Sequence, residues 1–170
     1  MEKTSFELLT AAAGDTLEAT WTESSVDLGA RVDSKNQFEF FIEYTPIAAE
    51  ITAGTAELHV RVLYTDEPAD KEDESGGNGT ISWKRYMVTA DRATPPTGVL
   101  EKDFKIKEWT IPADDVGADA ADSAILKKVH FGINDPAFVA TRIKLEFAEL
   151  TRDNAAQKGN VKARIGHRCY

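Results

Sequence analysis

The sequence predicts an all-β protein, an antiparallel β-sandwich with a jelly-roll-like arrangement of eight or nine strands. Three observations predict this class. Apolar and polar residues alternate with a period of two along much of the chain, as in strands with one buried face. No segment longer than two turns has a helical period. Long polar connections of varied length separate strands of the same character, which is typical of β-sandwiches.

The first half of the chain contains five expected strands. Pro46 removes a ladder donor and should end the fourth of them. The five segments are residues 5–9, 16–21, 25–29, 37–46 and 56–64. The residues expected to face the core are Leu17, Ala19, Trp21, Phe38, Phe40, Ile42, Tyr44, Leu58, Val60, Val62 and Tyr64.

The second half contains four more expected strands, two of them irregular. The apolar phase shifts by one residue within residues 80–90 and again within residues 103–111. Such a shift predicts a β-bulge or an edge strand. Residues 124–133 and 139–147 alternate cleanly, and at most one short helix is expected, near residues 113–122. The core-facing residues here are Ile81, Trp83, Tyr86, Val88, Phe104, Ile106, Trp109, Ile111, Ile125, Val129, Phe131, Ile133, Val139, Thr141, Ile143, Leu145 and Phe147.

The domain organisation follows from a contrast of charge. Residues 1–150 hold 28 acids and 15 bases, whereas residues 151–170 hold one acid and five bases. We therefore expect a sandwich domain over residues 1–150 and a basic tail over residues 151–170 that lies outside it. The tail is predicted to be an arm that reaches an adjacent subunit; a frayed terminus and contact with nucleic acid are the alternatives. The predicted partner-binding residues are Lys162, Arg164 and Arg168 for charge, with Ile165 and Tyr170 as apolar anchors.

Composition excludes several functional classes. A net charge of -9 argues against general binding of nucleic acid or anionic membranes by the body of the protein. The N-terminus lacks the pattern of a signal peptide, and no stretch has the roughly 20 apolar residues of a membrane span. The single cysteine, Cys169, excludes an internal disulfide and fits synthesis in a reducing cytoplasm.

No residues announce a catalytic, cofactor or metal site. The chain has three histidines and one cysteine, too few for a clear zinc site, and no nucleophile motif. His59 and His130 lie on the polar faces of their strands and are interpreted as solvated surface residues. We therefore expect no enzyme and no cofactor, although a pair of carboxylates among 29 acids stays open as a third possibility.

Two other features have competing interpretations. The acidic residues 66–79 are expected to form a mobile, exposed loop, with a calcium site as the alternative. Carbohydrate-binding modules are also jelly rolls that stack exposed aromatic rings on sugars. Because Trp21, Trp83 and Trp109 are partly in phase with core residues, we expect them to pack in the interior instead.

A family resemblance adds to these inferences. Residues 14–46, in which "SSVDLG" leads into a long alternating strand that ends near "YTP", resemble the opening of small structural proteins of tailed-phage virions. The stretches "LHVRVLYTD" and "ISWKRYMVT" fit the same style, so the resemblance covers roughly residues 14–90. It includes no catalytic or ligand-binding signature, and no functional residue is carried over from it.

The resemblance implies a non-enzymatic structural protein of a viral particle. Such proteins are commonly jelly-roll or immunoglobulin-like sandwiches that decorate capsids, join head to tail or build fibres. We expect a capsid-decorating or head-associated subunit, made in the host cytoplasm and located in the virion. Its expected partners are further copies of itself and a neighbouring virion protein such as the major capsid protein. A carbohydrate-binding or adhesion module, for example on a tail fibre, is the alternative.

Overall fold

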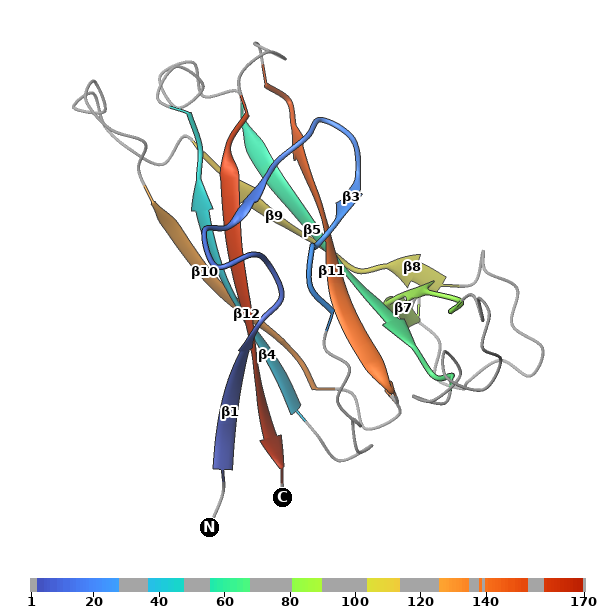
Figure 1. Cartoon of the computed structure of the whole chain (residues 1–170). Coiled ribbons are helices and arrows are strands. Elements are labelled where there is room, and N and C mark those ends of the chain that lie inside the picture. The colour runs from blue at the N-terminus through green and yellow to red at the C-terminus, as the bar shows by residue number, and fades with distance from the viewer. Residues whose placement is uncertain are drawn as a thin grey trace, which may run out of the picture.

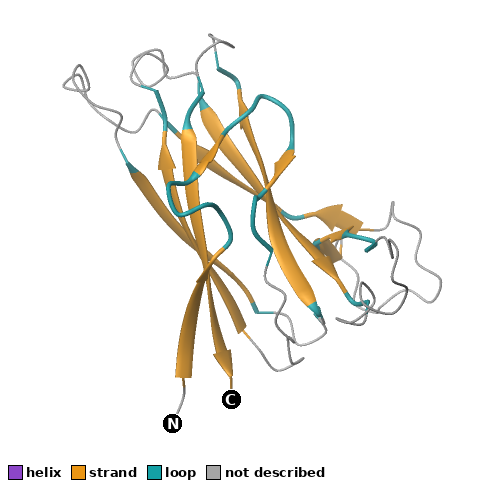
Figure 2. Cartoon of the chain, viewed as in Figure 1, coloured by secondary structure: helices purple, strands orange, loops and turns teal. Residues whose placement is uncertain are grey.

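The computed structural model is all-β, which confirms the predicted class. It describes residues 3–27, 37–47, 56–67, 81–89, 104–113, 126–134, 138, 140–152 and 158–169. Figure 2 shows strands and loops in these residues and no helix. The strands are β1 (Lys3–Leu8), β2 (Asp15–Thr16), β3 (Thr22–Glu23), β4 (Gln37–Thr45), β5 (Glu57–Thr65), β6 (Lys84–Arg85), β7 (Met87–Thr89), β8 (Phe104–Ile106), β9 (Glu108–Pro112), β10 (Lys127–Ile133), β11 (Arg142–Leu150) and β12 (Asn160–Cys169).

Two antiparallel sheets pack face to face (Figure 1). Sheet A has the order β1-β12-β4-β10, and β2 also pairs with β12. Sheet B has the order β3-β11-β5, and both β6 and β9 pair with the far side of β5. Strands β7 and β8 form a separate two-stranded sheet.

The strand order is that of a jelly roll. The eight strands that build the two faces are β1, β3, β4, β5, β9, β10, β11 and β12. Counted along the chain as first to eighth, they give sheets with the orders 1-8-3-6 and 2-7-4-5. This interlocking of two Greek keys defines the jelly roll and confirms the predicted architecture. The described residues contain twelve strands because short strands of two or three residues add to these eight.

The long strands place their predicted residues in the core. Phe38, Phe40, Ile42 and Tyr44 of β4 are all buried, and so are Leu58, Val60 and Val62 of β5, Phe131 and Ile133 of β10, and Ile143, Leu145 and Phe147 of β11. Tyr64 and Val129 pack against this core from its margin. The rings of Trp109 and Phe131 stack across the two sheets with centroids 4.0 Å apart. Ile125 and Val139 lie outside the described residues.

The segment after β2 differs from the expected strands. The chain leaves sheet A at Thr16 and joins sheet B at Thr22, so residues 17–21 cross between the sheets instead of forming a strand. Leu17 is buried by this crossing, whereas Ala19 is exposed. The predicted strand at residues 25–29 is wrong for its described part, residues 25–27.

The two phase shifts mark places where the chain changes pairing partner. β6 pairs with β5, and after Tyr86 the chain continues as β7, which pairs with β8. After Lys107 the chain returns to β5 as β9. The backbone amide of Tyr86 donates to Val62 at 2.8 Å, and that of Lys107 donates to Tyr86 at 3.0 Å. Neither a bulge nor a simple edge strand describes this exchange of partners.

The C-terminal segment is a central strand, so the prediction of a tail outside the sandwich is wrong for the described residues 158–169. β12 pairs with β4 on one side and with β1 and β2 on the other. Val161, Ala163 and Ile165 are completely buried. The segment forms a strand because small or apolar residues alternate with Lys162 and Arg164, which gives a period of two. The contrast of charge with the rest of the chain obscured this alternation. The predicted domain boundary at residue 150 therefore falls inside the sandwich.

Some expectations fall outside the described residues. They include most of the acidic segment, at residues 68–79, and the possible short helix at residues 114–122.

The central position of β12 predicts a large effect from Ile165. Ile165→Ala should lower the free energy of unfolding by about 2–5 kcal/mol, because it leaves a cavity in a closed core. Arg164→Ala, at the exposed neighbouring position, should change it by less than about 1 kcal/mol. Urea denaturation of the two variants provides the measurement. A cooperative thermal transition retained after deletion of residues 158–170 would contradict this position for β12.

Candidate functional site

A groove lined by aromatic residues lies on the outer face of sheet A. The register places Leu8 of β1, Arg164 of β12, Phe41 of β4 and His130 of β10 in one row across four strands. Phe6 stands in the next row of the same face, beside Gly166. The groove has a volume of about 370 Å³, in the size range of small ligand sites. Its lining residues are Phe6, Phe41, Ile42, Glu43, Lys128, Val129, His130 and Arg164.

The rings of the groove pack on one another. Phe41 and His130 stack with centroids 4.7 Å apart and planes inclined by 19°. Phe6 meets Phe41 edge-on at 5.6 Å and is 59% exposed. Gly166 makes room for this arrangement, since a Cβ there would lie 3.0 Å from the Phe6 ring. The face therefore presents aromatic carbon to the outside, where a solvated sheet face usually carries polar groups.

The charges around the groove are unevenly paired. Nζ of Lys128 lies 3.9 Å from Oε1 of Glu43, and Nε2 of His130 lies 3.5 Å from Oε2 of Glu39. Among the described residues, no carboxylate forms an ion pair with Arg164, which is exposed. An arginine fork beside aromatic rings is suited to a carboxylate attached to an apolar group.

The predicted partner-binding residues do not lie on one common surface. Lys162 and Arg164 share the outer face of sheet A, as their predicted role requires. Ile165 points into the core and cannot anchor a neighbour. The backbone of Arg168 pairs with Thr4 and Gln37, but its side chain and all of Tyr170 lie outside the described residues.

Sequence reasoning missed the aromatic members of the groove. Phe6 and Phe41 each occupy an outward position in their strands, and Phe41 interrupts the polar face formed by Glu39 and Glu43. An apolar residue at a position where the alternation predicts a polar one was the sequence feature that could have indicated the groove. His130 is outward-facing as predicted, but it stacks on Phe41 and is more than a solvated side chain.

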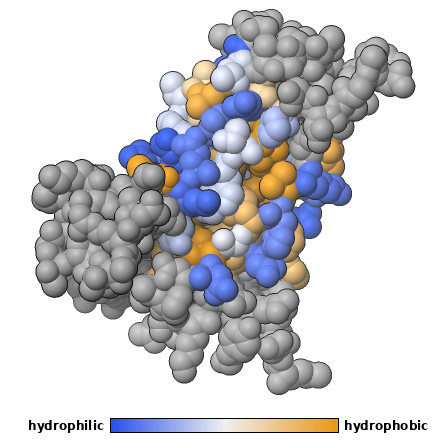
Figure 3. Space-filling model, turned by 180° about the vertical axis from the view of Figure 1, so that it is seen from behind, coloured by the Kyte–Doolittle hydropathy of each residue, from blue (hydrophilic) through white to orange (hydrophobic). Residues whose placement is uncertain are grey.

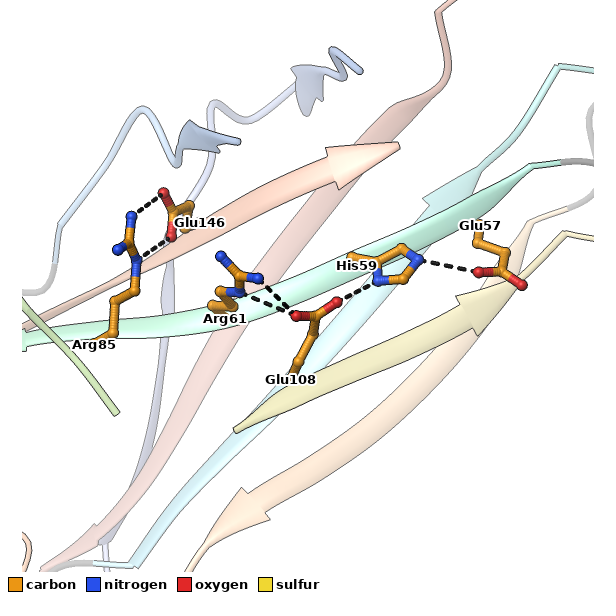
Figure 4. Close-up of polar contacts among 6 residues, drawn as sticks. All are labelled: Glu57, His59, Arg61, Arg85, Glu108 and Glu146. Carbon is orange, nitrogen blue, oxygen red and sulfur yellow. Dashed lines mark hydrogen bonds and ion pairs between the residues drawn. The ribbon is translucent and has the colours of Figure 1, made fainter. Parts of the chain in front are cut away.

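The outer face of sheet B carries a network of paired charges (Figure 4). His59 lies between two carboxylates, with Nδ1 against Glu108 and Nε2 3.0 Å from Glu57. The Arg61 fork donates to Oε2 of Glu108 at 2.8 and 3.1 Å. Only 14% of the His59 side chain is exposed, so the prediction that His59 is a solvated surface residue is wrong.

The network lowers the pKa of one carboxyl. Burial alone would raise the pKa of Glu108, but hydrogen bonds from His59 and Arg61 outweigh burial and hold that pKa below its usual range. His59 contacts Oε1 of Glu108 and Arg61 contacts Oε2, so both carboxylate oxygens have partners. The network therefore satisfies its own polar groups.

A second hollow on sheet B is also internally paired. It has a volume of about 360 Å³ and includes Trp83, Lys84, Arg85 and Glu146 among its lining residues. Arg85 donates to Glu146 at 3.1 Å, and Lys84 donates to Asp66 at 2.7 Å. This hollow offers a ligand fewer uncommitted charges than the groove of sheet A.

The three tryptophans are only partly buried, and other groups occupy their rings. The guanidinium of Arg61 lies 3.5 Å from the ring centroid of Trp21, and Nζ of Lys144 lies 4.0 Å from that of Trp83. Trp109 stacks on Phe131 and packs against the core. These contacts leave the tryptophans poorly suited to stack on sugar rings.

A buried carboxylate joins the sheets at one place. Glu149 of β11 is completely buried and accepts hydrogen bonds from the Tyr44 hydroxyl at 2.7 Å and from the Gly159 amide at 3.0 Å. Nη1 of Arg152 lies 3.2 Å from Oε2 of Glu149 and is the third partner of this carboxylate. Its partners are those of a structural ion pair, in which removal of one member leaves a buried charge.

Two further kinds of site are absent from the described segments. No group of three histidine, cysteine, aspartate or glutamate side chains in the described segments is arranged to hold a metal ion. Nor do these segments contain a helix long and apolar enough to cross a membrane. Seen from behind (Figure 3), the described surface mixes blue hydrophilic residues with small orange apolar patches.

Comparisons with known proteins gave structural similarity and no match of sequence or family. No family model and no curated protein matches the chain. The chain is similar to a solved structure of infectious bursal disease virus, Gx strain, with 10% sequence identity and a TM-score of 0.32. The match covers 98% of this chain and 32% of the viral chain, so this chain spans about a third of that protein's length. A TM-score at this level carries no functional assignment.

The lowered pKa of Glu108 predicts a pH dependence. A carboxyl with a depressed pKa in the folded state stabilises the fold above its unfolded pKa of about 4.3, and this stabilisation disappears as the pH falls through the folded value. Glu108→Gln should therefore reduce the loss of stability on acidification below about pH 4.3. Thermal melts across an acid pH series test this. Glu7→Gln, at an exposed position on β1, serves as the control. If both variants reduced the acid-induced fall in melting temperature equally, the role of the network would be contradicted.

Proposed function

We propose that the chain is a non-enzymatic structural protein of a viral particle. In this proposal it is a capsid-decorating or head-associated subunit that works as a homo-oligomer and attaches to a neighbouring virion protein. Its place of action is the virion, after synthesis in the host cytoplasm. The jelly-roll strand order supports the proposal, because this architecture recurs in viral capsid proteins. Lectin domains and cupins share that architecture, so the fold supports the virion role by analogy, whereas attachment to a neighbouring protein rests on the groove of sheet A.

The observation that carries the proposal is Arg164 within the aromatic groove. A charged fork beside exposed rings has the composition of an interface hot spot, where arginine and aromatic residues dominate binding. The network on sheet B is already satisfied by its own partners and would gain little from a second protein. The proposed attachment surface is therefore the outer face of sheet A, and its partner presents a carboxylate next to an apolar side chain.

A carbohydrate-binding or adhesion module is the second candidate. The specific support for it is the flat stack of Phe41 and His130, since exposed rings can pack against the apolar face of a sugar. This places the candidate site on Phe41 and not on the three tryptophans. A glycan array with the Phe41→Ala variant distinguishes the two candidates, because binding that is lost in this variant favours the sugar site.

The groove yields a direct prediction for attachment. Arg164→Gln should weaken binding to particles assembled without this protein by about tenfold or more, because it removes the charged fork. Arg85→Gln is a matched control with the same change of charge on the opposite outer face. Co-sedimentation of purified protein with the particles measures both affinities. Equal binding by the two variants would contradict attachment through the groove.

Localisation tests the functional class itself. Mass spectrometry of particles purified from cells that make the protein should detect the chain at high copy number. Its absence from those particles would overturn the proposed virion role.

A further inference from the structure

In the part of the chain that the structure describes, the outer edge of β1 is an unpaired sheet edge. Among the described residues, β1 pairs only with β12, so its other side has no strand beside it. In Figure 1 the strand lies at the lower end of the sandwich, next to the C-terminal half of β12. An exposed edge of this length is a template for pairing with another chain.

The direction of the backbone groups on β1 can be derived from one hydrogen bond. The amide of Leu9 donates to the carbonyl of Ala163 in β12 at 3.0 Å. Successive residues of a strand direct their N–H and C=O groups to opposite sides. The odd-numbered residues of β1 therefore face β12, and Thr4, Phe6 and Leu8 direct their backbone groups to the open edge.

The other edge strands have features that hinder pairing and that β1 largely lacks. β3 and β6 are two residues long, and β9 ends at Pro112. β10 begins with Lys127 and Lys128. Short strands, proline and lysine are the usual means by which proteins block sheet edges. β1 has six residues with one lysine, Lys3, at its start.

Apolar side chains follow the open edge. Phe6 is 59% exposed and Leu8 is 37% exposed, and both lie on the outer face of sheet A. They continue the aromatic surface of the groove up to the edge of the sheet. A neighbour that added a strand here would bury apolar area as well as satisfy backbone groups.

We propose that β1 pairs antiparallel with β1 of a second copy of this chain, about a two-fold axis at Phe6. Phe6 then lies opposite the partner's Phe6, Leu8 opposite the partner's Thr4, and Glu7 opposite the partner's Ser5. No two like charges face each other in this register, which is the electrostatic condition for self-pairing. The contact supplies roughly six backbone hydrogen bonds and closes at two copies, as an isologous interface does.

The pairing has a consequence for attachment that rests on the proposed function. A two-fold axis perpendicular to the sheet keeps both outer faces on the same side. The two grooves, each with its own Arg164, then lie on one continuous surface. A dimer would engage a repeated partner surface at two points, which raises its apparent affinity without new contacts.

Sedimentation of designed variants tests the dimer. The wild-type protein should show a concentration-dependent monomer–dimer equilibrium in analytical ultracentrifugation from micromolar to millimolar concentration. Thr4→Pro removes an outward-facing amide and leaves the ladder to β12 intact, so it should raise the dissociation constant by about tenfold or more. Phe6→Thr keeps the amide but removes the ring, and should weaken the dimer through lost apolar contact. Ser5→Pro is the control that breaks the inner ladder, and it should lower the melting temperature.

Hydrogen exchange on the wild-type protein provides a second measurement that does not depend on a variant folding. The amides of Thr4, Phe6 and Leu8 should gain protection as concentration rises, whereas those of Ser5 and Glu7 should be protected throughout. A wild-type protein that stays monomeric over the whole series overturns the proposal. So does a dimer whose even-numbered β1 amides exchange at the same rate at every concentration. A monomer that still occurs in particles would leave the proposed virion role intact but not the homo-oligomer, and a dimer absent from particles would overturn only the virion role.

Discussion

The insertion of β12 between β4 and β1 is the constraint on which the rest of sheet A depends. β12 pairs along its length with β4 on one side and with β1 and β2 on the other. Without it, β1 would have no sheet to join, and β4 would be left with β10 alone. Its inward residues Val161, Ala163 and Ile165 also complete the core. The jelly roll is therefore closed by β12, and the groove on its outer face depends on β12 lying between β1 and β4.

The sequence predicted the long strands well and the short or charged ones poorly, for identifiable reasons. β4, β5 and β11 each have nine residues, enough positions for a period of two to be visible. A strand such as β3 or β6 has two, and no period can be read from two residues. β12 does alternate, but its inward Ala163 contributes little hydrophobicity and its charges suggested a free arm. The groove could not be predicted in full, because Phe6 and Phe41 become neighbours only through a strand order that periodicity does not specify.

The basic character of the C-terminal segment has a structural explanation in the sheet itself. Lys162 of β12 lies directly opposite Glu43 of β4, so the basic strand adjoins an acidic one. Arg164 is the exception, since its direct neighbours are Leu8 and Phe41. On sheet B, Arg61 and Arg85 each meet a glutamate. Covering that paired face would cost the desolvation of ion pairs and return little, whereas a partner for Arg164 completes an interaction that the described part of the fold leaves open.

The distance along the chain between the paired strands links assembly to completion of the fold. β1 begins at Lys3, whose register partner is Cys169, so the two strands are separated by nearly the whole sequence. Contacts between residues so far apart in the sequence carry a loop-closure cost that local contacts do not, and they are slow to form. Until β12 is in place, β1 has no ladder to fix its direction, and its outward edge is not defined. In the proposed dimer, β1 can pair in register only after β12 has joined the sheet, so association through β1 follows the folding of β12.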